Sequence, residues 1–190
     1  MSESREWKQY VEMWMEHAKD KDDFLKMFCY FATFNMLYDG EYVKSEREPS
    51  QREKIAIFLY NNLQSGTKVE ENFTVPQDIK ELKRGVNQLH CNKDERTFSS
   101  TDKKFRTYIL KTINDDTAKW DNEIWKTIDL FIAAYIVRCN LFHGGKCPND
   151  PNDKKFVHEA VVLIEAFLKW FLKYNRDFEW HFHYGVSNEE

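Results

Sequence analysis

Apolar residues recur three and four positions apart along most of this chain, a period that is typical of helices with one buried face. Residues 5–18 carry such a stripe, and residues 22–40 carry a second one. A third stripe runs from a candidate N-cap at Ser50 to about Leu63. These segments predict three amphipathic helices in the first third of the chain.

Two longer stripes follow, over residues 117–143 and 153–175, joined by a turn rich in Pro, Asn and Asp. Asn152 or Asp153 is the expected N-cap of the last helix. One face of that helix is expected to be buried: Val157, Val161, Ile164, Leu168 and Phe171. Residues 130–137 are apolar all round, so this part of the preceding helix should be central in the fold.

Two segments depart from the helical period. Residues 66–101 are polar and aperiodic, with a short helix expected over about 77–90, and they read as an insertion or a long connection. Residues 177–184 alternate aromatic and polar side chains, which predicts an extended tail over 177–190. We therefore expect a single all-α domain over residues 1–190, an up-and-down helical bundle with a polar insertion.

Net charge limits how this domain could bind nucleic acid. A formal net charge of −4 and a pI near 5.9 give no general attraction to nucleic acid, so RNA or DNA would need a local basic patch. Lys103, Lys104 and Arg106 begin a helix whose exposed face is expected to be basic. This face is either an ordinary solvated surface or a weak RNA-binding patch.

The location of the protein is predicted from what the sequence lacks. No apolar run approaches the roughly 20 residues of a membrane-spanning helix, and no apolar signal region is visible near residue 1. The four cysteines show no zinc-finger spacing and are read as reduced thiols. His181 and His183 share one side of the tail but have no third ligand nearby. We expect a cytoplasmic protein with no membrane contact, metal or cofactor.

The clearest candidate for chemistry lies at the end of segment 117–143. One face of it is apolar at successive positions: Trp120, Ile124, Ile128, Phe131 and Tyr135. The next position on that face is Arg138, and His143 follows about 7.5 Å further along the axis. Gly144 and Gly145 are expected to end the helix. Arginine suits bidentate contact with phosphate, and histidine transfers protons near neutral pH.

A purely structural interpretation of the same residues stays open. A half-buried arginine commonly pairs with a core carboxylate, and Asp129 or an acid on the first helix is available. A histidine before glycine also stabilises a helix C-terminus.

Segment 138–143 resembles the motif of the HEPN superfamily (higher eukaryotes and prokaryotes nucleotide-binding domain), an Arg-x4-His pattern at the end of a central helix. The continuation LFHGGK is similar to a bacterial branch of that superfamily. Residues 24–38, FLKMFCYFATFNMLY, resemble the aromatic helix ending in FNxLY of the same branch.

The resemblance implies a helical bundle that dimerises so that two motifs share one cleft. It also implies a metal-independent endoribonuclease in which the RNA 2′-hydroxyl attacks the adjacent phosphorus. Arg138 and His143 would be the catalytic residues, with Asn140, Cys139 and Lys146 in supporting positions. Two departures stand out. Cys139 replaces the usual polar residue after the arginine, and Gly145 replaces a tyrosine that a nucleotidyltransferase antitoxin modifies in one subgroup.

Three hypotheses follow. The leading one is a homodimeric endoribonuclease of the toxin or anti-phage defence type, acting on RNA and restrained by an antitoxin or a defence-complex partner. The alternative is a non-catalytic HEPN module that binds nucleotide or RNA, or that serves as a structural subunit of a larger complex. The third is a helical interaction protein whose motif is only a helix cap and an ion pair.

Overall fold

Seven helices make up most of the part of the chain that the structure, a computed structural model, describes: residues 6–40, 47–63, 72–89, 103–112, 122–143 and 150–175. In chain order they are α1 (Glu6–Ala18), α2 (Asp23–Gly40), α3 (Gln51–Leu63), α4 (Lys80–Leu89), α5 (Lys103–Thr112), α6 (Asn122–Phe142) and α7 (Pro151–Tyr174). Over these ranges no strand is present, so the predicted all-α class is confirmed. The extended tail predicted over 177–190 lies outside the described residues.

The helix starts follow local capping chemistry. Asp22 accepts a hydrogen bond from the Leu25 backbone N–H at 3.0 Å and begins α2. Ser50 and Glu53 form a reciprocal capping box at α3, because the Glu53 carboxylate accepts from the Ser50 N–H at 2.8 Å and the Ser50 hydroxyl accepts from the Glu53 N–H at 3.4 Å. The predicted cap at Ser50 is confirmed.

The predicted cap of the last helix, Asn152 or Asp153, was wrong by two or three residues. Asp150 is the N-cap of α7, and its side chain accepts from the Asn152 and Asp153 backbone N–H groups. Pro151 follows at the first helical position, where its fixed φ and missing N–H cost nothing. The α7 helix therefore begins earlier than its apolar stripe does.

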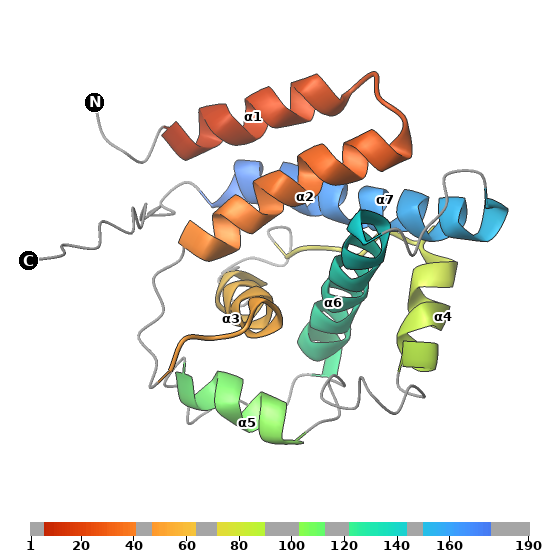
Figure 1. The fold of residues 1–190 in the computed structure, drawn as a ribbon. Helices are drawn as coiled ribbons and strands as arrows, with labels where there is room; N and C mark the ends of the chain where they lie inside the picture. Colours follow the sequence, from red (N-terminus) through yellow and green to blue (C-terminus); the bar gives the residue numbers. More distant parts are fainter. Residues whose placement is uncertain are drawn as a thin grey trace, which may run out of the picture.

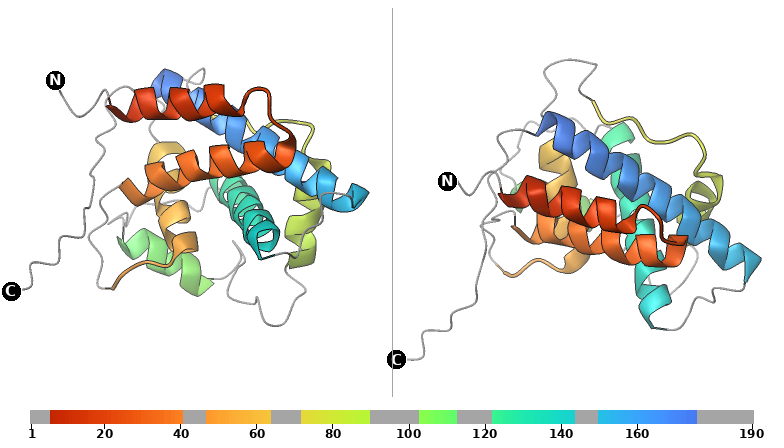
Figure 2. Two further views of the ribbon diagram at one scale, coloured as in Figure 1. Left: turned by 45° about the horizontal axis from the view of Figure 1, so that its top comes forward. Right: turned by 90° about the horizontal axis from the view of Figure 1, so that it is seen from above.

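The helices are arranged around α2, α6 and α7 (Figure 1). α1 and α2 form an antiparallel hairpin, and α7 runs beside them (Figure 2). α3 and α6 cross beneath this layer, with α5 against α3 and α4 against both α6 and α7. The first turns of α2 and α7 and the last turn of α6 lie on the same side of the molecule in these views.

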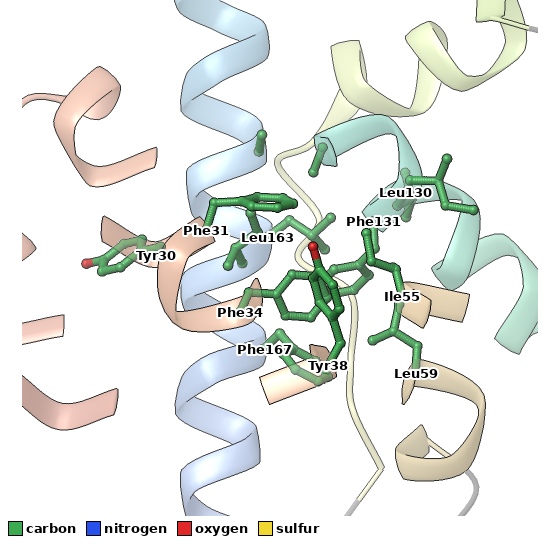
Figure 3. Packing of buried hydrophobic residues seen from close by; sticks show 14 of the residues in the cluster. Tyr30, Phe31, Phe34, Tyr38, Ile55, Leu59, Leu130, Phe131, Leu163 and Phe167 are labelled. Atoms are coloured by element: carbon green, nitrogen blue, oxygen red, sulfur yellow. The ribbon is translucent and has the colours of Figure 1, made fainter. Parts of the chain in front are cut away.

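Aromatic rings from six helices contribute to the core, which Figure 3 shows in part. The Phe34 ring lies 5.3 Å from that of Phe131 and 5.5 Å from that of Phe167, and all three side chains are fully buried. Such edge-to-face and tilted pairs each contribute about 0.5–1.5 kcal/mol beyond burial of their area. The predicted burial of residues 130–137 is confirmed for all except the half-buried Tyr135, and the predicted α7 face is confirmed throughout.

The described part of the polar connection belongs to the body of the fold. Phe73 contacts the core rings, and Ile79 and Leu82 are buried. The buried Glu159 carboxylate of α7 accepts hydrogen bonds from the Glu81 and Leu82 backbone N–H groups at 3.1 and 2.6 Å, so that it caps α4 from a distant segment.

The exposed basic face predicted for α5 requires a correction at Arg106. This side chain is only 9% exposed, with its guanidinium 4.9 Å from the centre of the Trp125 ring. Burial lowers the pKa of Arg106, and the nearby Asp129 carboxylate opposes that shift. Arg106 therefore stabilises the α5–α6 contact instead of facing RNA. The side chains of Lys103 and Lys104 lie outside the description.

Membrane insertion finds no support in the described helices, none of which is long and apolar enough to cross a bilayer.

Candidate functional site

The candidate site forms where α6 leaves the core. Val137 is still buried, Arg138 and Cys139 are half-buried, and Asn140 and His143 are exposed. The His143 backbone N–H donates to the Cys139 carbonyl at 3.0 Å, so the helical hydrogen-bond pattern continues one residue past α6. The expected glycine cap at Gly144 and Gly145, and Lys146, lie outside the described residues.

Aromatic rings hold the Arg138 guanidinium. Its central carbon lies 4.6 Å from the centre of the Phe142 ring, one turn later on α6, and 5.7 Å from that of Phe31 on α2. Contact with ring faces stabilises a cation while leaving its N–H donors directed elsewhere.

The carboxylate partner considered for Arg138 is not found. Asp129 exerts its resolved electrostatic effect on Arg106. Within the described ranges, Arg138 forms no ion pair with any carboxylate. A half-buried arginine whose neighbours are rings retains its capacity to bind an anion.

An exposed apolar patch borders this arginine. The rings of Phe28 and Phe142 lie 5.7 Å apart and are 45% and 47% exposed. Leu25, one turn before Phe28, is 52% exposed. We call Leu25, Phe28 and Phe142 the apolar patch. Although the sequence places Leu25 and Phe28 on the apolar stripe of residues 22–40, the structure leaves both at the surface.

Cys139 has a neighbour that sequence reasoning assigned only to the core stripe. Tyr135 lies one turn earlier on α6, close enough for the Cys139 side chain to affect the ionisation of the Tyr135 hydroxyl. Burial raises the pKa of Tyr135, the Cys139 contact adds to the rise, and Arg52 and Arg138 act in the opposite direction. The position that is usually polar in the resembled family therefore has a phenol as its neighbour one turn earlier.

A polar network that the sequence did not predict lies behind Arg138. The buried Tyr38 hydroxyl contacts the Asn35 side-chain oxygen and lies 2.9 Å from Gln51 Oε1, while Lys54 Nζ lies 3.2 Å from Asp39 Oδ1. Burial and then Asp39 raise the pKa of Tyr38, and the charge of Arg138 lowers it. The network joins the end of α2 to the start of α3 within electrostatic range of Arg138. Its only sequence signal is the polar spacing at Asn35, Tyr38 and Asp39.

Metal and thiol chemistry find little support in the described residues. Among them, no group of three or more His, Cys, Asp or Glu side chains is placed to hold a metal ion. Cys29 and Cys139 are free thiols, while Cys91, Cys147 and the tail histidines His181 and His183 lie outside the description.

Comparisons with protein-family models, with curated proteins and with solved structures found no match to this chain.

Proposed function

We propose that this protein is a metal-independent endoribonuclease of the HEPN type, in which Arg138 and His143 carry the reaction. The proposal rests mainly on the surroundings of the Arg138 guanidinium. Its guanidinium is held by Phe31 and Phe142 without a carboxylate partner among the described residues, at the exposed end of α6 that also bears His143.

The reaction balances with these two side-chain types alone. One imidazole takes the proton of the RNA 2′-hydroxyl as that oxygen bonds to the adjacent phosphorus. The bond from phosphorus to the 5′-oxygen breaks, and a second, protonated imidazole gives its proton to that leaving oxygen. The products are a 2′,3′-cyclic phosphate and a 5′-hydroxyl. Arg138 stabilises the negative charge on the phosphorane.

A homodimer supplies the second imidazole, because one histidine cannot be acid and base in the same step. The apolar patch gives that dimer a surface beside the site, since Leu25, Phe28 and Phe142 are each about half exposed. We place this activity in the cytoplasm, as a toxin or anti-phage nuclease that an antitoxin or a defence-complex partner restrains.

One observation favours the alternative, a non-catalytic HEPN module that binds nucleotide or RNA. A half-buried cysteine, Cys139, stands where the family usually has a polar residue, and the exposed Asn140 lies about 100° further round the helix. In this alternative Arg138 binds phosphate without cleavage.

Cleavage assays in EDTA on single-stranded and structured RNA test the proposal. Wild type should cleave, and His143→Ala and Arg138→Ala should each lose at least a hundredfold in rate, which is the typical effect of removing a group that stabilises the transition state. His17→Ala, an exposed histidine on α1, is the matched control and should cleave as wild type does. Full activity in His143→Ala would contradict the site, and RNA binding without cleavage by wild type would favour the alternative.

A further inference from the structure

A groove lies beside the candidate site, between the start of α2 and the start of α7. Its volume is about 810 Å³, and its walls are formed by Asp22, Asp23, Phe24, Leu25, Lys154, Lys155 and His158. His158 Nδ1 lies 2.8 Å from Asp23 Oδ2 and joins the two walls. The groove is open to solvent, and part of its lining is apolar, from Phe24 and Leu25.

The acidic side chains of the groove have partners, whereas its two lysines form no ion pair within the described ranges. Asp22 is engaged as the N-cap of α2, and Asp23 pairs with His158. Lys154 and Lys155 are exposed, and within the described ranges neither forms an ion pair. Both lie in the first turns of α7, where the helix dipole adds positive potential. Lys154 and Lys155 are therefore available to bind an anion, next to the carboxylates of Asp22 and Asp23, which the α2 cap and His158 engage.

The groove is continuous with Arg138. Leu25 lines the groove and lies one turn before Phe28, whose ring contacts that of Phe142. Phe142 in turn contacts the Arg138 guanidinium. The starts of α2 and α7 and the end of α6 lie on one side of the molecule (Figures 1 and 2).

We infer that this groove binds the single-stranded RNA segment next to the cleaved phosphate, with Lys154 and Lys155 on backbone phosphates and Phe24 against a base. The inference rests on the proposed function for the location of the cleaved phosphate. Charge and an apolar wall together fit single-stranded nucleic acid, whose binding combines phosphate contacts with base stacking. Lys154 and Lys155 are local cations for such an RNA on a chain whose net charge of −4 gives no general attraction to nucleic acid.

The experiment measures binding of a fluorescent single-stranded RNA to the full chain carrying His143→Ala, with and without Lys154→Ala/Lys155→Ala. Lys169→Ala/Lys173→Ala is the control, because it removes the same charge from exposed positions on the same helix, with Lys169 about 22 Å along the axis from Lys154. The groove variant should bind about tenfold more weakly, and its salt dependence, the slope of log K against log salt, should fall by about 1.4, the value for two lost phosphate contacts on a single strand.

The outcomes separate this inference from the proposed function. If RNA binding depends on Lys154 and Lys155 but wild type does not cleave RNA, the proposed nuclease activity is contradicted and the groove remains an RNA-binding site. In a chain that retains His143, a Lys154→Ala/Lys155→Ala variant that cleaves RNA with the wild-type rate, KM and salt dependence would contradict RNA binding in the groove and leave the proposed nuclease intact. An absence of RNA binding by wild type, or a loss of dimerisation instead of RNA affinity in the groove variant, would overturn the inference.

Discussion

Arg138 keeps an available charge at the protein surface because aromatic rings, and no carboxylate among the described residues, contact its guanidinium. This arrangement uses two properties that lysine lacks, the flat face of the guanidinium and its forked donors. Lysine at position 138 should therefore support the reaction much less well than arginine.

Arg138→Lys keeps the charge but loses contact with the Phe31 and Phe142 rings and bidentate phosphate binding. We expect RNA cleavage to fall by about a hundredfold or more, with the circular dichroism spectrum unchanged, because a lysine cannot reproduce the planar geometry. Single-turnover rates measure the loss. A rate within threefold of wild type would mean that only the charge of Arg138 matters.

The sequence predicted the position of Arg138 and His143 at the end of α6, because a helical stripe fixes which face each residue occupies. It did not predict the Phe31 contact, which depends on how α2 passes the end of α6 in space. It was wrong about Arg106 because basic spacing along a helix does not reveal that an indole such as Trp125 covers the guanidinium.

At the scale of the helices, carboxylates at helix starts fix the boundaries that position the site. Glu53 caps α3 and contacts Arg47, whose guanidinium lies 4.2 Å from the centre of the Tyr108 ring of α5. Burial opposes the ionisation of Glu53, but the hydrogen bonds from Arg47 and Ser50 outweigh it and lower the pKa.

A lowered pKa in the folded state means that Glu53 stabilises the fold above its unfolded-state pKa, and that this contribution is lost as the pH falls through the folded-state pKa. Glu53→Gln should lower the free energy of unfolding at pH 7 by about 1 kcal/mol and weaken its dependence on pH below about 4.5, the ordinary value. Urea unfolding at several pH values measures both. Glu16→Gln, whose ion pair with Lys19 is exposed, should change neither quantity, and equal effects would contradict the role of Glu53.

Glu159→Ala should destabilise α4 in particular, because two backbone N–H groups lose their acceptor, at a cost of about 1–3 kcal/mol. Hydrogen exchange should accelerate in the first turns of α4 and remain slow in α7. Glu165→Ala, on the same helix with a more exposed ion pair to Lys169, serves as the control. If amide hydrogen exchange in α4 were unchanged in Glu159→Ala, the Glu159 cap would contribute nothing to the stability of that helix.

These caps differ in how far the sequence predicts them. Ser50 and Glu53 are three residues apart, so the capping box is visible in the chain itself. Glu159 lies 77 residues from Leu82, and only the packing of α7 against α4 brings the two together. The Asp150 cap was missed because the apolar stripe of α7 begins after its first turn.

At the scale of the whole molecule, the proposed dimer requires the apolar patch to be covered by a second copy. Leu25→Ser/Phe28→Ser should weaken dimerisation at least tenfold with little change in unfolding, because both side chains are about half exposed. Tyr10→Ser/Met13→Ser removes comparably exposed side chains from α1 and should leave the dimer intact. Sedimentation velocity over a range of concentrations gives the answer. A monomeric wild type, or equal effects of the two variants, would contradict a dimer through this patch.

In the proposed reaction, Arg138 and His143 direct attack by the RNA 2′-hydroxyl. The most direct measurement compares one RNA sequence with its 2′-deoxy counterpart, in EDTA, using wild type and His143→Ala, and identifies the product ends by mass spectrometry. Only wild type should cleave, only the RNA strand should be cut, and the products should carry 2′,3′-cyclic phosphate and 5′-hydroxyl ends. Cleavage of the deoxy strand, 5′-phosphate ends, or an active His143→Ala variant would contradict it.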